Sequence, residues 1–597
     1  NGGVLTTNGN PLSLSGNFTM NTGATLDIST GNFTVNGNCT INGGTISGNG
    51  TFTASGTTTV FGSSTGNPLI QPPVVATTNS ITFRNTTFQN SVTITKTGNG
   101  NDNSYGGNTF NNAAAFINNG NGNFLFANTS KDIFNGDVYF TNSGNGIIYP
   151  AYNDVTGTQF NGNITVSSTN GSGIQFGSGT GSATLASGKT IAIGGGGFVK
   201  GTLLLKRFTQ SGNAAVNFSM GSNSSLILGP GSTLNGDVTS SSGVLQLNGC
   251  TFGGLSDLTK TGNSNDQSTG ANTFNGNSII TNSGNGYLLL GNTNADAWNG
   301  DASFINNGSG HFFIAYNSAG NRVNGNASIQ NIGTGGGSTN FYVCESGATS
   351  SIQFDGPVEI VNGGTSTNAV VRFGNKGATI FNDDVTLNST AGSSSSYGIH
   401  LGVSGGTGST TLAAGKTLRI GASGFSKGGL QFNNFTQAGN APIDLPMSGT
   451  ATLIFGSSTV IGGNIESTCP GVTFNGGMFN GTASFTKTGS SNETSNGGNK
   501  FRSSLDLQNT GSGNILMGNS NPDSITGNLS VINSGSGYVY LAHNSAGNNY
   551  AGDCSLLNSG SGSDNRIQIC ESTGSSAVFG GNVSALNTST ANTALIR

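Results

Sequence analysis

The chain has 597 residues, of which 102 are glycine and only 7% carry a charged side chain. Ordinary soluble domains have about 7% glycine and about 25% charged residues, so a row of conventional globular domains is excluded. The net charge is −4 and the 19 lysines and arginines are dispersed. This argues against nucleic-acid binding, because phosphates need a concentrated basic surface. No apolar run reaches the roughly 20 residues of a membrane-spanning helix, so no membrane span is expected.

Short packets of alternating apolar and polar residues indicate β-strands rather than disorder. Hydrophobic residues make up 33% of the chain, and packets such as Phe33-Thr34-Val35 have a period of two residues. Gly or Asn interrupts every stretch within about ten residues, and both are poor helix formers. We therefore predict an all-β chain.

Residues 1–80 are predicted to form a β-solenoid segment with short coils. The stretch 12–63 contains brief strand-and-turn units, and a proline-rich stretch follows at 67–77. Because apolar alternation resumes at Ile81, we interpret the proline-rich stretch as a switch in coil type rather than a hinge.

A long repeat occupies the rest of the chain. Thr-Lys-Thr-Gly occurs around Lys96, Lys260 and Lys487. A Phe follows each of these lysines at the same distance, at Phe110, Phe274 and Phe501. We call the separation from Lys96 to Lys260 the short offset and the separation from Lys260 to Lys487 the long offset. These offsets predict three β-solenoid repeats: a shortened copy over 81–243, a full copy over 244–470 and a truncated copy over 471–597.

A shorter unit, aromatic-Asn-Gly followed by a strand, recurs at spacings of about 24 to 31 residues. We interpret each unit as strand, Gly-rich turn, strand and turn. It would form one coil of a single-stranded parallel β-solenoid (β-helix), with roughly two dozen coils in an elongated rod on the order of 110 Å long. The aromatic positions are predicted to stack from coil to coil as a structural ladder: Phe110, Phe134, Phe160, Phe274, Trp298, Phe354, Phe381 and Phe501.

The composition follows from such stacking. Asn at matching positions of successive coils is expected to form amide ladders, and Gly supplies the positive φ angles of sharp corners. Low charge is expected because like charges stacked one coil apart repel each other.

The two ends of the chain and its cysteines give two further expectations. Asn1 is not a start residue, no capping coil is evident, and residues 592–597 match the middle of the preceding repeat. A segment of a longer protein is therefore expected. The six cysteines show no paired spacing and are predicted to be buried thiols, with a Cys554–Cys570 disulfide as the alternative.

No constellation of catalytic residues is evident, so we expect no enzyme. The adjacent pair Asp383-Asp384 falls on a turn motif, and His311, His400 and His543 do not cluster. A carbohydrate-active β-helix, such as a polysaccharide lyase or hydrolase, would need clustered carboxylates with a base or calcium.

One acidic position recurs in the long repeat. Asp102, Asp266 and Glu493 each follow the repeat lysine at the same short distance, in loops rich in Asn, Ser and Gly. Such oxygen-rich loops suit calcium or the hydroxyl groups of a glycan. A solvated loop, or pairing of the acid with the nearby lysine, is the alternative. No other cofactor is expected.

The Phe-Asn-Gly unit at 134–136 and the Asn-Ser-Gly-x-Gly unit at 142–146 resemble the repeats of giant surface adhesins of Bacteroidota. Filamentous-haemagglutinin-type adhesins are similar in architecture. The resemblance implies an extracellular, cell-surface stalk or filament that serves attachment or gliding motility and contacts glycans or abiotic surfaces. Its partners would be the remainder of a larger polypeptide or neighbouring filament subunits. Our leading hypothesis is a structural rod, and a self-assembling fibre subunit is a further alternative.

Overall fold

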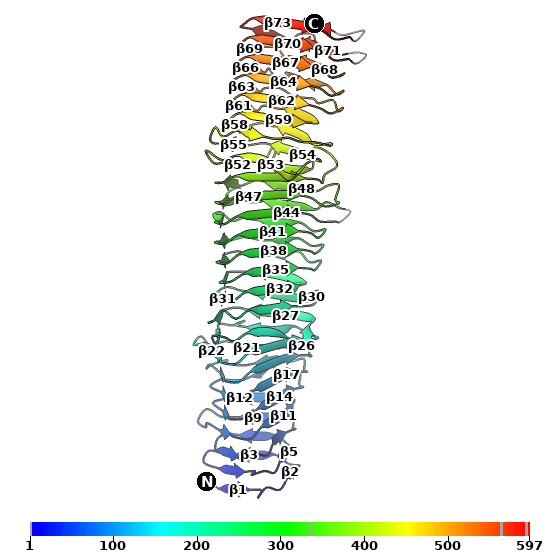
Figure 1. Cartoon of the computed structure of the whole chain (residues 1–597). Helices are drawn as coiled ribbons and strands as arrows, with labels where there is room; N and C mark the ends of the chain where they lie inside the picture. Colours follow the sequence, from blue (N-terminus) through cyan, green and yellow to red (C-terminus); the bar gives the residue numbers. More distant parts are fainter. Residues whose placement is uncertain (1–2, 335–336, 562–564, 591–594) are drawn as a thin grey trace. The chain divides into compact units, whose positions relative to one another are not determined.

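The computed structural model describes residues 3–334, 337–561, 565–590 and 595–597, and these contain β-strands but no helix (Figure 1). The chain divides into two compact units, unit 1 (Asn1–Ser278) and unit 2 (Ile279–Arg597). Among the described residues there is no helix that is long and apolar enough to cross a membrane. Residues 592–597 were predicted to match the middle of the preceding repeat, and 592–594 lie outside the described residues.

A typical coil has three strands, which lie on three faces of the solenoid. Among the described residues, the coil of β61 (Met478–Phe479) and β62 (Ala483–Lys487) has strands on the first two faces only. One coil of unit 1 runs through β19 (Ile133–Phe134) on the first face, β20 (Val138–Asn142) on the second face and β21 (Ile147–Ala151) on the third face. Each strand pairs in parallel with its counterpart in the next coil. The predicted parallel β-solenoid is therefore confirmed. The coil has three strands where the repeat indicated two, because a two-residue strand such as β19 is too short to show a period.

The number of coils also agrees with the prediction. Among the described residues, 25 strands belong to the first face and 25 to the second. The second face has the longer strands. In unit 1 they are β2 (Leu12–Leu14), β5 (Phe33–Val35), β8 (Phe52–Ala54), β11 (Val74–Thr78), β14 (Val92–Lys96), β17 (Ala114–Asn118), β20, β23 (Ile164–Ser168), β26 (Ile191–Phe198), β29 (Val216–Ser219), β32 (Val238–Ser242) and β35 (Ser256–Lys260). Strand β38 (Ser278–Asn282) begins at the last residue of unit 1. The second-face strands that follow it in unit 2 are β41 (Ala302–Asn306), β44 (Ala327–Asn331), β47 (Val358–Asn362), β50 (Val385–Ser389), β53 (Leu418–Phe425), β56 (Ile443–Asp444), β59 (Ile465–Cys469), β62 (Ala483–Lys487), β64 (Leu505–Asn509), β67 (Leu529–Asn533), β70 (Cys554–Asn558) and β73 (Val583–Asn587).

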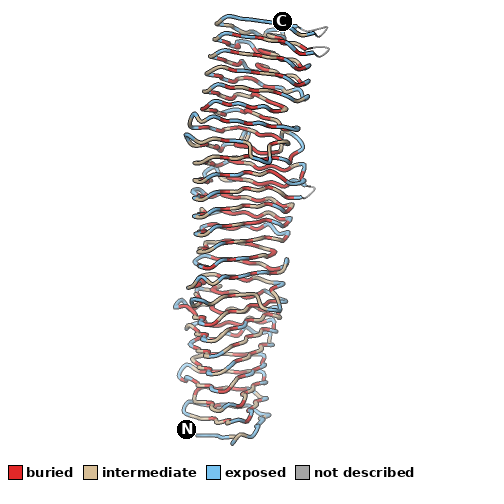
Figure 2. Tube along the Cα trace, viewed as in Figure 1, coloured by how far each residue is buried: buried red, intermediate tan, exposed pale blue. Residues whose placement is uncertain are grey.

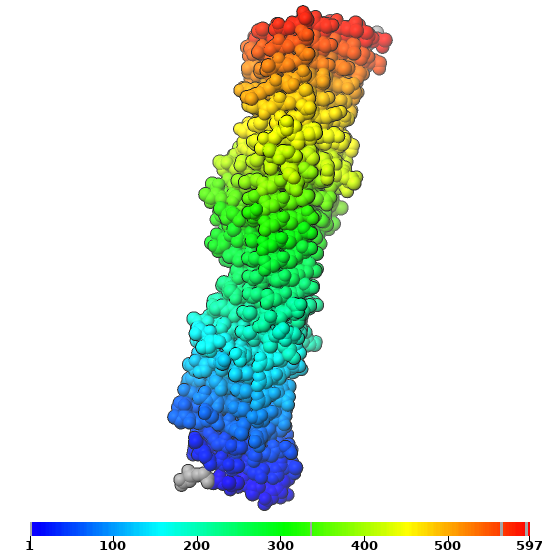
Figure 3. All heavy atoms as spheres, turned by 60° about the vertical axis from the view of Figure 1, so that its left-hand side comes forward, coloured from blue at the N-terminus to red at the C-terminus, as the bar shows by residue number. Residues whose placement is uncertain are grey.

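The core of each unit lies inside the coils. Along β14 the side chains of Val92, Ile94 and Lys96 are buried and those between them are half-buried, as expected when alternate residues of a strand point to opposite sides. The same alternation of buried and less buried residues is visible in both units (Figure 2). Within each unit the coils pack in sequence order, each against the coils before and after it (Figure 3). Every second residue of such a strand is thus buried, because the sequence alternates with a period of two residues.

The eight aromatic residues of the expected ladder are all buried, on the first face. Phe110, Phe134 and Phe160 stack with ring centroids 4.8 and 5.0 Å apart and rings almost parallel. Phe274 stacks in the same way on Phe252 of the preceding coil, and Phe501 stacks on Phe479. These spacings equal the distance between coils, so one ring per coil fills the same place in the core.

Aliphatic residues interrupt this aromatic column. In unit 2, β43 (Asn321–Val323) pairs with both β40 (Ala297–Trp298) and β46 (Ser351–Phe354). Val323 therefore lies between Trp298 and Phe354, and Phe354 stacks on Phe381 at 5.5 Å. Val323 is fully buried, so any apolar side chain of suitable volume can occupy the column.

The predicted long offset has a structural counterpart. It separates strands β26 and β53, which are both eight residues long and both shift register against the preceding coil. The third face of unit 1 includes one sheet from β3 (Phe18–Met20) to β12 (Ser80–Phe83), another from β15 (Asp102–Asn103) to β33 (Val244–Leu247), and strand β36 (Asp266–Gln267). The boundaries proposed for the three repeats remain predictions.

Candidate functional site

A column of buried asparagines runs along the second face, at the last position of the five-residue strands. In unit 2 the Nδ2 atom of Asn306 donates a hydrogen bond to Oδ1 of Asn331 (3.0 Å), and Asn331 donates to Asn362 (3.1 Å). All three side chains are fully buried. This confirms the expected amide ladder, and each amide also donates to a backbone carbonyl of a neighbouring turn.

The three repeat lysines occupy the same column. Lys96 is paired in register with Asn118, Lys487 with Asn509, and Lys260 with Ser242. All three lysine side chains are fully buried. The Nζ atom of each donates to the carbonyl oxygen two residues further on, at 2.6, 2.6 and 2.8 Å for Lys96, Lys260 and Lys487. The ammonium group thus takes the place of an amide of the ladder.

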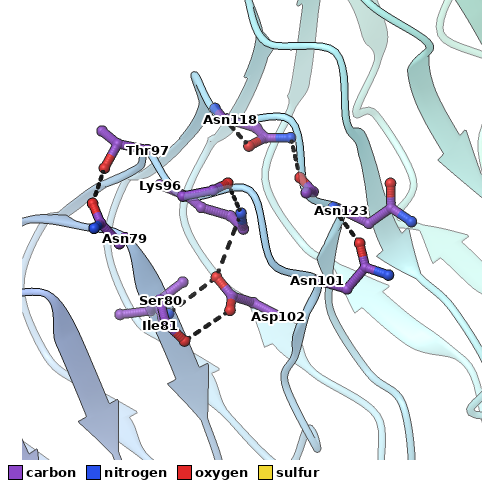
Figure 4. A network of polar contacts seen from close by, with 12 residues as sticks. Asn79, Ser80, Ile81, Lys96, Thr97, Asn101, Asp102, Asn118 and Asn123 are labelled. Carbon is purple, nitrogen blue, oxygen red and sulfur yellow. Dashed lines mark hydrogen bonds and ion pairs between the residues drawn. The ribbon is translucent and has the colours of Figure 1, made fainter.

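Asp102 accepts hydrogen bonds from the coil before it and lies beside the buried lysine (Figure 4). One carboxylate oxygen accepts from Oγ of Ser80 (2.9 Å), and the other accepts from the backbone N–H of Ile81 (3.1 Å). Nζ of Lys96 is 3.8 Å from Oδ2, and the two side chains are 0% and 5% exposed. The carboxylate therefore links two coils through bonds within the protein.

The equivalent acids of the other repeats have related surroundings. Asp266 is buried and accepts from the backbone N–H of Leu245 and from Oγ of Ser264, both at 2.8 Å. Glu493 is half-buried and accepts from Oγ1 of Thr473 at 3.3 Å. Asp102 therefore lies beside the nearby lysine, as the pairing alternative expects, and the binding of calcium or a glycan by these three acids stays a prediction.

Burial dominates the electrostatics of the first pair. It lowers the pKa of Lys96, whereas the neighbouring Asp102 raises that pKa. It also raises the pKa of Asp102, against the hydrogen bonds from Ser80 and Ile81 and the charge of Lys96. The attraction between the two charges thus offsets part of the cost of burying each of them.

A second buried acid was not predicted from the sequence. Asp132 accepts from the backbone N–H of Asn108 (2.9 Å), from Nδ2 of Asn108 (2.8 Å) and from the N–H of Ala127 (3.0 Å). In unit 2, Asp523 makes the same two bonds to Asn499. Burial raises the pKa of Asp132 to about 7 and that of Asp523 to about 6. The repeats would have revealed these residues, because the short offset leads from Asp132 to Asp296 and the long offset from Asp296 to Asp523.

Half-buried aromatic pairs on the outer side of the third face were also missed. Their positions are related by the same short and long offsets. The pairs, with their centroid distances, are Tyr149 with Tyr152 (5.0 Å), Phe313 with Tyr316 (5.3 Å) and Tyr540 with His543 (5.0 Å). The signal was available in the sequence, but nothing there indicated that these rings point outward.

The middle pair belongs to a larger group in unit 2, which we call the aromatic strip and which consists of His311, Phe313, Tyr316, Tyr342, Glu345 and Arg372. Strands β42 (Phe312–Ile314), β45 (Asn340–Val343) and β48 (Val370–Phe373) place Phe313, Tyr342 and Arg372 in register on successive coils. The rings of Phe313 and Tyr342 are 5.1 Å apart, and the Arg372 guanidinium lies 5.1 Å from the Tyr342 ring centroid. Arg372 also pairs with Glu345 at 3.4 Å.

The remaining candidates have local roles. Nζ of Lys416 pairs with Asp383 at 2.7 Å, and Asp384 accepts from the backbone N–H of Thr417, as expected for a turn. All six cysteines are free thiols, and Cys570 is the most exposed of them. His311 belongs to the aromatic strip, and His400 is paired in register with Arg372. His543 belongs to the last aromatic pair.

Among the described residues, no three His, Cys, Asp or Glu side chains are grouped so that they could hold a metal ion. The chemistry that these residues offer is therefore a buried polar network that joins coils, together with outward aromatic pairs once per repeat. Comparison of the chain with protein-family models, with curated proteins and with solved structures returned no match.

Proposed function

We propose that the chain is a mechanical spacer, the stalk of an extracellular bacterial adhesin or surface filament. The observation that carries this proposal is the parallel pairing of successive coils within each unit. In β14, β17 and β20 all five residues pair in register with the next coil. Backbone hydrogen bonds between every pair of coils would transmit load from one coil to the next, and buried ladders would resist local opening.

The surface location rests on the resemblance to repetitive adhesins of Bacteroidota. Such a stalk would project a binding region away from the cell and serve attachment or gliding motility. Its partners would be the rest of a longer polypeptide, or neighbouring subunits of a filament. A stack with few charges and closely bonded strands suits an exposed location, because a protease needs an open segment of chain to cleave.

Small-angle X-ray scattering of the purified chain tests the spacer directly. If the two units stack in one line, 25 coils at about 4.8 Å give a length of about 120 Å and a radius of gyration of about 35 Å. A compact globular chain of this size would have a radius of gyration of about 25 Å. A value near the smaller figure would contradict the proposal.

The enzymatic alternative has its own test. Incubation of the purified chain with a panel of polysaccharides, followed by measurement of reducing ends and of unsaturated products, would detect a hydrolase or a lyase. We expect no turnover above that of a heat-denatured sample. Turnover of any glycan would replace the spacer with a carbohydrate-active enzyme.

A further inference from the structure

The aromatic strip of unit 2 is not required by the fold. Its register row continues through His400 to Gln431, Ile454 and Thr473 on the following coils. Polar and aliphatic residues are thus accommodated at the same outward position. The aromatic residues Phe313 and Tyr342 therefore call for another explanation than coil stacking.

We propose that the aromatic strip binds the pyranose rings of a neutral polysaccharide. A pyranose ring has apolar C–H faces that stack on aromatic rings and a rim of hydroxyl groups that both donate and accept hydrogen bonds. The strip offers both kinds of partner. Half-buried rings lie on successive coils, and the polar side chains of Glu345 and Arg372, 19% and 26% exposed, lie at one end.

Three polar atoms of the strip have no hydrogen-bond partner although they are buried. They are Nδ1 of His311, Oε2 of Glu345 and Nε of Arg372. Leaving such a group without a partner is costly, so a small shift of the partly exposed Glu345 or Arg372 side chain toward a ligand hydroxyl would gain a hydrogen bond. The guanidinium needs an acceptor and the carboxylate a donor. A hydroxyl group supplies both, whereas a purely anionic group such as phosphate supplies acceptors only.

The charges of the strip favour a neutral ligand. Nη1 of Arg372 lies 3.4 Å from Oε1 of Glu345, and Nδ2 of Asn375 donates to the same oxygen at 3.0 Å. The positive charge is therefore already balanced within the protein, and an anionic polymer would face the carboxylate as well.

Recurrence supports a binding role rather than a local accident. Tyr149 with Tyr152, and Tyr540 with His543, repeat the pair Phe313 with Tyr316. Within unit 2, nine coil steps separate β41 from β67, about 43 Å at 4.8 Å per coil. One long glycan chain can then contact two aromatic sites, which raises its apparent affinity above that of a short oligosaccharide.

Affinity electrophoresis of the full chain tests the proposal. Native gels would contain hydroxyethyl cellulose, xylan, galactomannan or dextran, with alginate as the charged comparison. We expect at least one neutral polymer to retard the wild-type chain. Phe313→Ala and Tyr342→Ala should each weaken this retardation about two- to twelvefold, since an aromatic contact contributes roughly 0.5–1.5 kcal/mol. Tyr139→Ala is the matched control, because Tyr139 is 44% exposed on the second face and should bind as wild type.

Several results would overturn the proposal. They are no retardation by any neutral polymer, retardation by alginate alone, or an equal loss in Tyr139→Ala. If sedimentation shows a dimer that Phe313→Ala dissociates, the strip is an interface between copies and not a glycan site. If an alanine variant has a lowered melting temperature, Glu345→Gln serves as the test instead, because it preserves the shape of the side chain. We expect it to weaken binding as well. The inference does not depend on the spacer role, since scattering and electrophoresis give separate results.

Discussion

Gly120 lies directly over Gly98 of the preceding coil, so closely that a Cβ atom on Gly120 would overlap the carbonyl oxygen of Gly98. Gly144 stacks on Gly120 in the same way one coil further on. None of these three glycines has a positive φ. Their lack of a side chain therefore serves close approach between turns and not backbone conformation.

Gly120→Ala should destabilise unit 1 by about 1–3 kcal/mol, because the backbone that it would meet cannot move as a side chain can. Gly100→Ala is the matched control in the neighbouring turn, since no atom lies within 4 Å of its Cβ position. Thermal unfolding followed by circular dichroism measures both variants. Equal melting temperatures for the two would show that stacking does not constrain the turn.

Asp102→Ala leaves the ammonium of Lys96 buried without its carboxylate. We expect a loss of about 3–5 kcal/mol in local stability, the usual cost of breaking a buried ion pair. The double variant Lys96→Asn/Asp102→Asn should lose less, because Asn118 in the adjacent register position shows that this column accepts an amide. Hydrogen exchange of the β14 and β17 amides measures the difference. A double variant less stable than Asp102→Ala would contradict it.

The pH dependence of stability should reveal Asp132. Burial raises its pKa from 3.8 to about 7, so between these values the folded chain holds a proton that the unfolded chain has lost. The free energy of unfolding contributed by this group therefore falls as the pH rises from about 4 to about 7. Asp132→Asn should remove this group's share and make the slope shallower, which melting temperatures measured across the range would detect; Asp523, whose pKa burial raises to about 6, keeps its own share in the variant.

The comparison of variant with wild type isolates this group. His311 and His400, whose pKa values burial lowers, act in the opposite direction in both proteins. Asp506→Asn, at an exposed position of β64, is the matched control and should keep the wild-type slope. Parallel curves for wild type and Asp132→Asn would show that Asp132 titrates alike in both states.

Asn331→Ala removes one step of the amide ladder. Asn306 would lose an acceptor and Asn362 a donor, so we expect local stability to fall by about 2 kcal/mol. The exposed ladder bond from Asn161 to Asn135 provides the control, because Asn161→Ala should change stability by less than about 0.5 kcal/mol. Native-state hydrogen exchange in the flanking strands measures the local stability of both variants.

Much of the fold could be predicted because each coil repeats the same local pattern. Period-two packets determined the strands, and the recurring aromatic-Asn-Gly unit determined the coil and the buried places of Phe134 and Trp298. The short strand that a typical coil contributes to the first face was not evident. Strands such as Ile133–Phe134 have only two residues, and the pairing that defines them is made with other coils.

The candidate site was less accessible to sequence reasoning. The spacing of Lys96 and Asp102 was plain, but their loop composition suggested solvent, whereas the strands of neighbouring coils enclose both side chains. The recurrence of Asp132 and of the ring pair Phe313 and Tyr316 was also present in the repeats. Whether such residues point inward or outward depends on the register between coils, which no local pattern specifies.

The sequence by itself determined an all-β chain of stacked coils, because alternation, turn residues and internal repeats are local properties of the chain. High glycine and low charge already indicated close stacking. Only the tertiary structure decided that Gly120 is required by the carbonyl of Gly98, that Lys96 is a member of an asparagine column, and that Phe313 faces outward. Each of these is a relation between residues of adjacent coils, such as Lys96 with Asn118 or Phe313 with Tyr342, and it exists only once the coils are in register.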